Sequence, residues 1–295
     1  MRLKTLGICI AAVLFAAGHK IVCAGGFTSC KGEARASRPV SNVPSRLKNS
    51  ITGSEFAKKT TGLTGRLRQK AAVTELKRGN MPDFMRTLYP VTLSAMGKDS
   101  SFMRAVIWVS PDYLSIGSDP DFLRMSLSLP SASMVLRRLG CVLPTRKMVD
   151  SICVQAHVRL EPRPMRPGPR MRSSEYYLRH QRIIEEQRRH GPVKGIIAGQ
   201  KKDVVLTNLL WKKIGRIAIY GWQGVEEKPI QPLSTVHGEN YADYSHGIRL
   251  VSDQVCFDGR WRSIYDVLGD SVLAPVLTYE NVIRRPRKLI GRYRQ

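Results

Sequence analysis

The sequence is poor in acidic and aromatic residues. It has 23 Asp and Glu against 48 Lys and Arg, which gives a formal net charge of +25, and aromatic residues make up 7% of the chain. Such a charge favours association with polyanions. Proteins that bind single-stranded nucleic acid usually place aromatic rings among their basic residues, and no helix-turn-helix, zinc-finger or RNA-recognition pattern is present. Nucleic acid is therefore the minor alternative, and we expect another polyanion as the partner.

Long apolar runs are also missing, apart from one near the start. Residues 5–18, TLGICIAAVLFAAG, follow Arg2 and Lys4 and precede the small-residue sequence VCA, which ends at Ala24. This order is typical of a secretory signal peptide, and about 14 apolar residues are too few to cross a bilayer. We expect residues 1–24 to be removed and the mature chain, without a transmembrane segment, to be exported to a periplasm or the exterior. The nearest polyanions there are polymers of the cell envelope, such as peptidoglycan.

Cysteine is scarce, and no two cysteines form a CxxC pair, which excludes a zinc ribbon. After removal of the leader four remain: Cys30, Cys141, Cys153 and Cys256. An even set in an oxidising compartment predicts either disulfides, with three possible connectivities, or plain buried thiols.

The apolar pattern predicts an α+β fold, because strand-like and helical segments follow one another without regular βαβ alternation. Residues 25–80 are predicted to be a flexible basic linker. An α+β part follows at 81–158, and a strand-rich C-terminal part at 173–283. Between them, residues 159–172 hold four prolines and five arginines, which predicts an exposed basic loop. Residues 284–295 are predicted to be an exposed basic tail.

Several elements have clear local signals. TLYPVTLSAM, residues 87–96, is predicted to be a strand because β-branched and aromatic residues dominate it. The helix predicted at 145–156 has Thr145 at its N-cap and Cys153 on its apolar face. The segment 173–191 is predicted to be a solvent-facing helix, capped by Ser174, which carries His180 and His190 among its arginines.

Histidine is rare as well, and two of the six stand nine residues apart in STVHGENYADYSHGIRLVSD, residues 234–253. Each of these two, His237 and His246, is followed by glycine. Histidine transfers protons near neutral pH, and glycine lets a substrate backbone approach closely. We therefore predict that both imidazoles converge on one site, with Gly238 and Gly247 beside the substrate.

The residues between and after the two His-Gly pairs supply further candidates. Asp243 or Ser245 is a candidate for orienting an imidazole, and Tyr241 for contacting a substrate. Arg249 is expected to bind a substrate carboxylate through two hydrogen bonds. The alternative is an ordinary surface hairpin, in which Tyr241 and Tyr244 alternate with Asp243.

Three short segments carry a family resemblance: His237-Gly238, Ser245-His246-Gly247 and Ile248-Arg249-Leu250. Together they resemble the catalytic motif of the L,D-transpeptidases, exported enzymes that cross-link peptidoglycan peptides through an acyl-enzyme on cysteine. The resemblance implies an activity on peptidoglycan with His246 as acid and base. The family's cysteine directly follows the second glycine, where this chain has Ile248, and the gap between the two motifs is about half the family's usual length. The nucleophile is therefore left open.

Two mechanisms remain for an enzyme. In a covalent one, Cys256 or Cys141 supplies a thiolate whose pKa a nearby histidine lowers. In a hydrolytic one, His237, Asp243 and His246 hold zinc and leave one position for an activated water; no other cofactor is expected. The rival hypothesis is a protein without catalytic activity that binds an anionic envelope polymer through the same residues.

Overall fold

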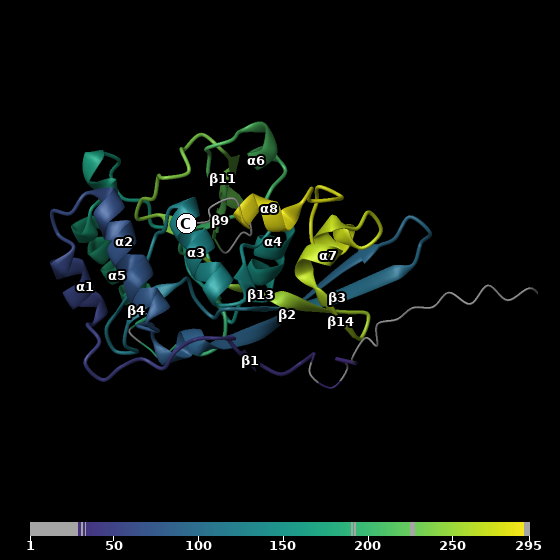
Figure 1. Cartoon of the computed structure of the whole chain (residues 1–295), viewed down its shortest axis with the longest axis horizontal. Coiled ribbons are helices and arrows are strands. Elements are labelled where there is room, and N and C mark those ends of the chain that lie inside the picture. The colour runs from purple at the N-terminus through teal and green to yellow at the C-terminus, as the bar shows by residue number, and fades with distance from the viewer. Residues whose placement is uncertain are drawn as a thin grey trace, which may run out of the picture.

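The computed structural model describes residues 29, 30, 32, 34–189, 191, 193–224 and 228–291. The predicted signal peptide 1–24 and His190 lie outside these residues. Every helix in the described part is too short or too polar to span a membrane. Figure 1 shows helices α1, α2 and α5 gathered at one end of the molecule, and the long hairpin of β2 and β3 at the other.

The expected α+β class is confirmed: mixed sheets are covered by short helices. The largest sheet has the order β1 (Arg38–Pro39), β2 (Thr87–Met96), β3 (Phe102–Val109), β13 (Val251–Phe257), β14 (Arg260–Ser263), with β6 (Cys141–Val142) also paired to β13. All of these pairs are antiparallel. The strand predicted at residues 87–96 is confirmed as β2.

A smaller sheet positions the two-His stretch. Its order is β11 (Pro229–Ser234), β10 (Ile219–Gln223), β9 (Lys202–Val204), β12 (His246–Gly247). Strand β12 runs parallel to β9, so that His246 is the register partner of Lys202. Two short pairs complete the strands: β4 (Ser115–Gly117) with β5 (Phe122–Arg124), and β7 (Val158–Arg159) with β8 (Ile197–Ala198).

The α-helices are α1 (Gly53–Lys59), α2 (Gly65–Lys77), α3 (Leu129–Arg138), α4 (Arg146–Val154), α5 (Ser174–Gln187), α6 (Leu209–Lys212), α7 (Ile264–Gly269) and α8 (Pro286–Gly291). The described residues also form three short 3-10 helices: η1 (Asp83–Arg86), η2 (Pro169–Arg172) and η3 (Ala274–Val276).

The prediction of a flexible linker over residues 25–80 is wrong for its second half, which contains α1 and α2. Thr52 forms a capping box with Glu55 at the start of α1. Phe56 and Leu76 are buried in the core. A few well-spaced apolar residues outweigh the basic composition, because burial of one face is enough to hold an amphipathic helix.

The predictions for two other helices differ in their outcome. Thr145 caps α4, as predicted, by accepting a hydrogen bond from the Met148 amide, and Cys153 is buried. Helix α5 is capped by Ser173 rather than Ser174. The Ser174 hydroxyl is buried and bonds to the hydroxyl of Thr60, so this helix packs onto α1 and is not simply solvent-facing.

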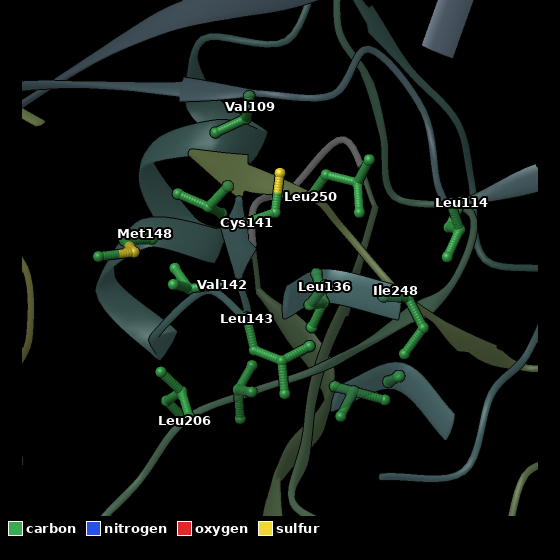
Figure 2. Close-up of a cluster of buried hydrophobic side chains, with 14 of the residues drawn as sticks. Val109, Leu114, Leu136, Cys141, Val142, Leu143, Met148, Leu206, Ile248 and Leu250 are labelled. Carbon is green, nitrogen blue, oxygen red and sulfur yellow. The ribbon is translucent and has the colours of Figure 1, made fainter. Parts of the chain in front are cut away.

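One hydrophobic core joins the two sequence parts at 81–158 and 173–283. Strand β3 from the first pairs with β13 from the second. Figure 2 shows the consequence: Val109 and Leu136 lie in the same cluster as Ile248 and Leu250. The predicted exposed tail is also partly structured, since Leu289 in α8 is buried in this core.

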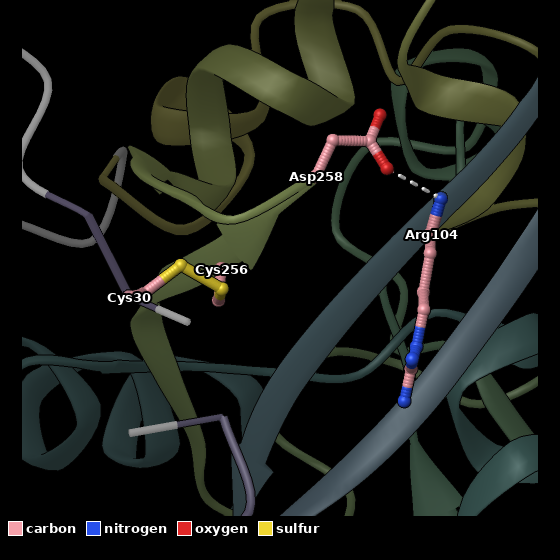
Figure 3. The surroundings of a disulfide bond; sticks show 4 residues. All are labelled: Cys30, Arg104, Cys256 and Asp258. Carbon is pink, nitrogen blue, oxygen red and sulfur yellow. Dashed lines mark hydrogen bonds between the residues drawn. A yellow bond between two sulfur atoms is a disulfide. The ribbon is translucent and has the colours of Figure 1, made fainter. Parts of the chain in front are cut away.

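A disulfide between Cys30 and Cys256 ties the N-terminal segment to β13, with the two Cα atoms 6.0 Å apart (Figure 3). Beside it, the carboxylate of Asp258 accepts a hydrogen bond from the Arg104 amide, which holds the β13–β14 turn to β3. Cys141 and Cys153 remain buried thiols, so the structure has one disulfide and none of the three two-disulfide connectivities.

Candidate functional site

The two-His stretch enters the interior and does not form a surface hairpin. Residues 242–250 are buried along their whole length. We call His237, Tyr241, Asp243, Ser245 and His246 the two-His site. The strand β12 carries its buried end, and the bridge between Arg216 and Gly238 holds its outer end.

The structure brings both imidazoles together around Tyr241. The ring of His237 is half-buried and stacks on the Tyr241 ring, with centroids 4.1 Å apart. The centroid of His246 lies 5.9 Å from that of His237 and 5.6 Å from that of Tyr241. His246 is 0% exposed, and neither of its ring nitrogens has a hydrogen-bond partner among the described residues. Of the two imidazoles, only that of His237 therefore reaches the surface.

The carboxylate of Asp243 links Tyr241 and Ser245 through hydrogen bonds. One carboxylate oxygen accepts hydrogen bonds from the Ser245 amide, at 2.8 Å, and from the Ser245 hydroxyl, at 2.6 Å. The other oxygen accepts from the Tyr241 hydroxyl, at 2.9 Å, and lies 4.0 Å from Nε2 of His246. Because the Ser245 hydroxyl donates to this carboxylate, it is held away from both imidazoles and not aligned as a nucleophile.

Burial decides the protonation of the imidazoles. It is the largest cause that lowers the pKa of His246 and of His237, and the negative charge of Asp243 opposes it in both cases. Burial alone would raise the pKa of Asp243, but the charge of His246 and the hydrogen bonds from Ser245 and Tyr241 hold that pKa below its usual value. At pH 7 the site therefore combines two neutral imidazoles with one carboxylate.

Basic side chains surround the open side of the site. Lys202 lies beside His246 in the sheet register, with its ammonium 4.9 Å from the centroid of the Trp222 ring. The guanidinium of Arg172 lies 5.2 Å from the centroid of the Tyr241 ring. Such a frame favours an anionic ligand, or negative charge that develops during a reaction.

A second group, beneath the site, was missed from the sequence. Burial lowers the pKa of Lys201 to about 7 and raises that of Asp203 to about 6. The Tyr113 hydroxyl donates to the Asp203 carboxylate at 2.8 Å. The only signal was the run GQKKDVV, residues 199–205, in which charged residues enter an apolar strand.

Comparisons with known proteins do not extend the motif: no family model, no curated protein and no solved structure matches the chain. The resemblance to the L,D-transpeptidases rests on residues 237–250 alone. Ile248, at the position of that family's cysteine, is fully buried.

The two proposed thiol nucleophiles do not reach the two-His site. Cys256 is bonded to Cys30 in the disulfide of Figure 3. Cys141 lies in the core cluster of Figure 2, where burial raises the pKa of its thiol and Sγ donates to the Leu139 carbonyl. The prediction that either one supplies a thiolate here is wrong, because one is oxidised and the other is held in its neutral form.

The predicted substrate contacts of Arg249 and Gly247 are also wrong. Arg249 is buried, and its guanidinium donates to the carbonyls of Ser110, at 3.0 Å, and Ile197, at 2.8 Å. A Cβ atom on Gly247 would lie 2.3 Å from the Tyr113 ring, so this glycine makes room for a tyrosine of the core. Gly238, in contrast, is exposed, and a Cβ atom there would make only an ordinary contact, 3.9 Å from the Gly215 carbonyl oxygen.

The three predicted zinc ligands do not form a metal site. Within the described ranges, no group of three or more His, Cys, Asp or Glu side chains is placed to hold a metal ion. Zinc–nitrogen and zinc–oxygen bonds are about 2 Å long. Both oxygens of Asp243 already accept hydrogen bonds, and His237 is stacked flat on Tyr241.

A well-formed cavity lies elsewhere. It measures about 750 Å³ and opens between α5, η1 and the β4–β5 turn, lined by residues such as Phe84, Phe122 and Arg182. No member of the two-His site lines it. A ligand of the two-His site would meet the exposed edge of His237, since His246 is buried.

Proposed function

We propose that the protein is an exported hydrolase of the cell envelope that cuts peptide bonds of peptidoglycan by acid–base catalysis at the two-His site. The observation that carries the proposal is His246, an imidazole with 0% exposure and no hydrogen-bond partner among the described residues. A buried polar group without a partner costs about 1–3 kcal/mol. An apolar residue would serve a purely structural role better, so a role in binding or catalysis accounts for the histidine.

His237 is the proton-transfer residue in this proposal. Its neutral imidazole accepts a proton from water as the water oxygen attacks the peptide carbonyl carbon. The same proton then passes to the peptide nitrogen as the carbon–nitrogen bond breaks, which leaves His237 neutral again. The charge of Asp243 favours the protonated intermediate form of His237.

Two other groups support this step. Lys202 stabilises the negative charge that develops on the carbonyl oxygen. His246 is buried, so it supports the step indirectly, through the Asp243 carboxylate 4.0 Å from its Nε2, and does not contact the substrate. Because water is the nucleophile, the mechanism needs no cysteine, in keeping with Ile248 at the position of the family's thiol.

The test is mass spectrometry of purified muropeptides incubated with residues 25–295. The parent and the control His157→Gln, a histidine outside the site that is exposed, should both release shortened peptides, each cut adding one water. His237→Gln should release none, with an unchanged circular dichroism spectrum. No product from the parent, with or without zinc and reductant, would overturn the proposal, and products of exchange without added water would indicate transpeptidation instead.

The pH dependence gives a second readout. The base must be neutral to accept a proton, and burial lowers the pKa of His237 below its usual value. Activity should therefore persist below pH 6.5 and fall only as the pH drops through this lowered pKa.

The rival function, a binder of anionic envelope polymers without catalysis, is favoured by the basic frame of Lys202 and Arg172. It predicts salt-sensitive polymer binding that His237→Gln leaves intact, together with no turnover by the parent.

A further inference from the structure

The Pro/Arg-rich loop, residues 159–172, does not merely separate two parts of the chain, because its backbone is fastened to the two-His stretch. The Met165 amide donates to the Tyr244 hydroxyl at 2.7 Å, and the Tyr244 amide donates to the Met171 carbonyl at 3.0 Å. Tyr244 lies between Asp243 and Ser245 in the sequence. One residue of the two-His stretch thus holds the loop at two points.

A third point comes from α5, where the Tyr176 hydroxyl donates to the Arg166 carbonyl at 2.7 Å. Near its end, the loop is also bound by Arg68 of α2, which donates to the Arg172 carbonyl. The loop is therefore placed beside the site by hydrogen bonds to three separate elements.

Within the loop, the methionines pack toward the core, whereas the arginines are exposed to solvent. Met165 and Met171 are half-buried and pack against the core. The exposed arginines are Arg163, Arg166, Arg170 and Arg172. The first three make no ion pair or side-chain hydrogen bond with any described residue, and the guanidinium of Arg172 lies over the Tyr241 ring. The loop thus carries three exposed positive charges that the described part of the chain does not neutralise, and a fourth, Arg172, lies against the two-His site.

The guanidinium groups and prolines of the loop indicate which class of ligand it would bind. Guanidinium groups bind carboxylates through paired hydrogen bonds, and prolines restrict the backbone, which reduces the entropy lost when a ligand is held. Single-stranded nucleic acid would need exposed rings for stacking. The nearby rings are engaged: Tyr244 and Tyr176 bind the loop backbone, and Tyr241 stacks on His237.

We propose that Arg163, Arg166, Arg170 and Arg172 form a clamp for a polymer that carries repeated carboxylate groups, such as the peptides of peptidoglycan, and hold it across His237. This inference rests on the proposed function for the identity of the site that the polymer crosses. The binding step itself involves no bond making or breaking and is measurable without turnover.

The experiment measures sedimentation of the protein with insoluble peptidoglycan from which phosphate polymers have been removed, over a range of salt concentrations. All proteins carry His237→Gln, so that the polymer stays intact. The loop variant adds Arg163→Gln, Arg166→Gln and Arg170→Gln. The matched control removes the same charge from exposed positions of α1 and α2 with Lys58→Gln, Lys59→Gln and Lys77→Gln.

The loop variant should bind about tenfold more weakly, because three exposed ion pairs are lost and each contributes modestly, and the control should bind much as the parent does. Equal losses in both variants, or no loss in either, would overturn the clamp. Binding only to walls that retain phosphate polymers, or tighter binding to DNA than to peptidoglycan, would overturn the carboxylate ligand. Loop-dependent binding without any muropeptide cleavage by the parent would uphold the clamp and reject the hydrolase.

Discussion

The imidazole of His237 lies flat on the ring of Tyr241, with the ring planes 8° from parallel. The hydroxyl of the same tyrosine donates to the Asp243 carboxylate. Tyr241 therefore covers the buried part of the site and joins its surface histidine to its carboxylate. Sequence spacing alone suggested a direct contact between the histidines and Asp243, whereas the tyrosine stands between His237 and that carboxylate.

We predict that Tyr241 keeps the pKa of His237 low by shielding its ring from water. Tyr241→Ala should raise that pKa toward 6.5, because burial is the largest cause of the shift. Tyr241→Phe retains the stacked ring and should raise it much less. Titration of the imidazole proton signals by NMR measures both. An unchanged His237 pKa in Tyr241→Ala would show that the stack has no such role.

The two glycines of the His-Gly pairs should respond differently to the same substitution. Gly247→Ala places a Cβ atom 2.3 Å from the Tyr113 ring and should lower the free energy of unfolding by about 1–3 kcal/mol, as overpacking does. Gly238→Ala adds a Cβ atom at an ordinary 3.9 Å from the Gly215 carbonyl oxygen and should change it by less than about 0.5 kcal/mol. Urea unfolding followed by circular dichroism compares them, and equal effects would contradict the packing at Gly247.

Lys201 should make stability rise with pH in the alkaline range. Burial lowers its folded-state pKa from 10.5 to about 7, so between these values the unfolded chain binds a proton that the folded chain does not. The free energy of unfolding then increases with pH, by up to about 1.4 kcal/mol per pH unit. Lys201→Met should remove this increment, whereas Lys59→Met at an exposed site should keep it. Urea unfolding at pH 7.5 and 9.5 gives the change in the free energy of unfolding with pH. Equal changes for the parent and both variants would show that Lys201 does not cause the increase.

The disulfide should contribute to stability through the unfolded chain. The variant Cys30→Ser with Cys256→Ser should lower the free energy of unfolding by about 2–4 kcal/mol. Thiol titration provides an independent check on residues 25–295. The denatured, unreduced protein should show two thiols, from Cys141 and Cys153, and four after reduction. Four thiols before reduction would exclude the bond.

Local signals in the sequence were sufficient for part of this structure. The β-branched and aromatic residues of 87–96 form a strand, and Thr145 caps its helix, because each depends on neighbours within a few residues. The rarity of histidine and the repeated His-Gly pair drew attention to 234–253, whose two imidazoles do lie close together. Average composition gave a wrong prediction for α1 and α2, because a few buried apolar residues decide whether these segments form helices.

The sequence by itself therefore determined the α+β class, several strand and helix positions, and the stretch in which the two imidazoles occur. Only the tertiary structure decided which side chains face one another. Arg249 donates hydrogen bonds to the carbonyls of Ser110 and Ile197, and the missing side chain of Gly247 leaves room for the Tyr113 ring. Both contacts form only when distant segments of the chain pack together. The same packing withdrew Cys141 into the core, fastened the Pro/Arg-rich loop to Tyr244 and placed Arg172 over the Tyr241 ring. Burial and the partners it supplies are properties of the folded chain.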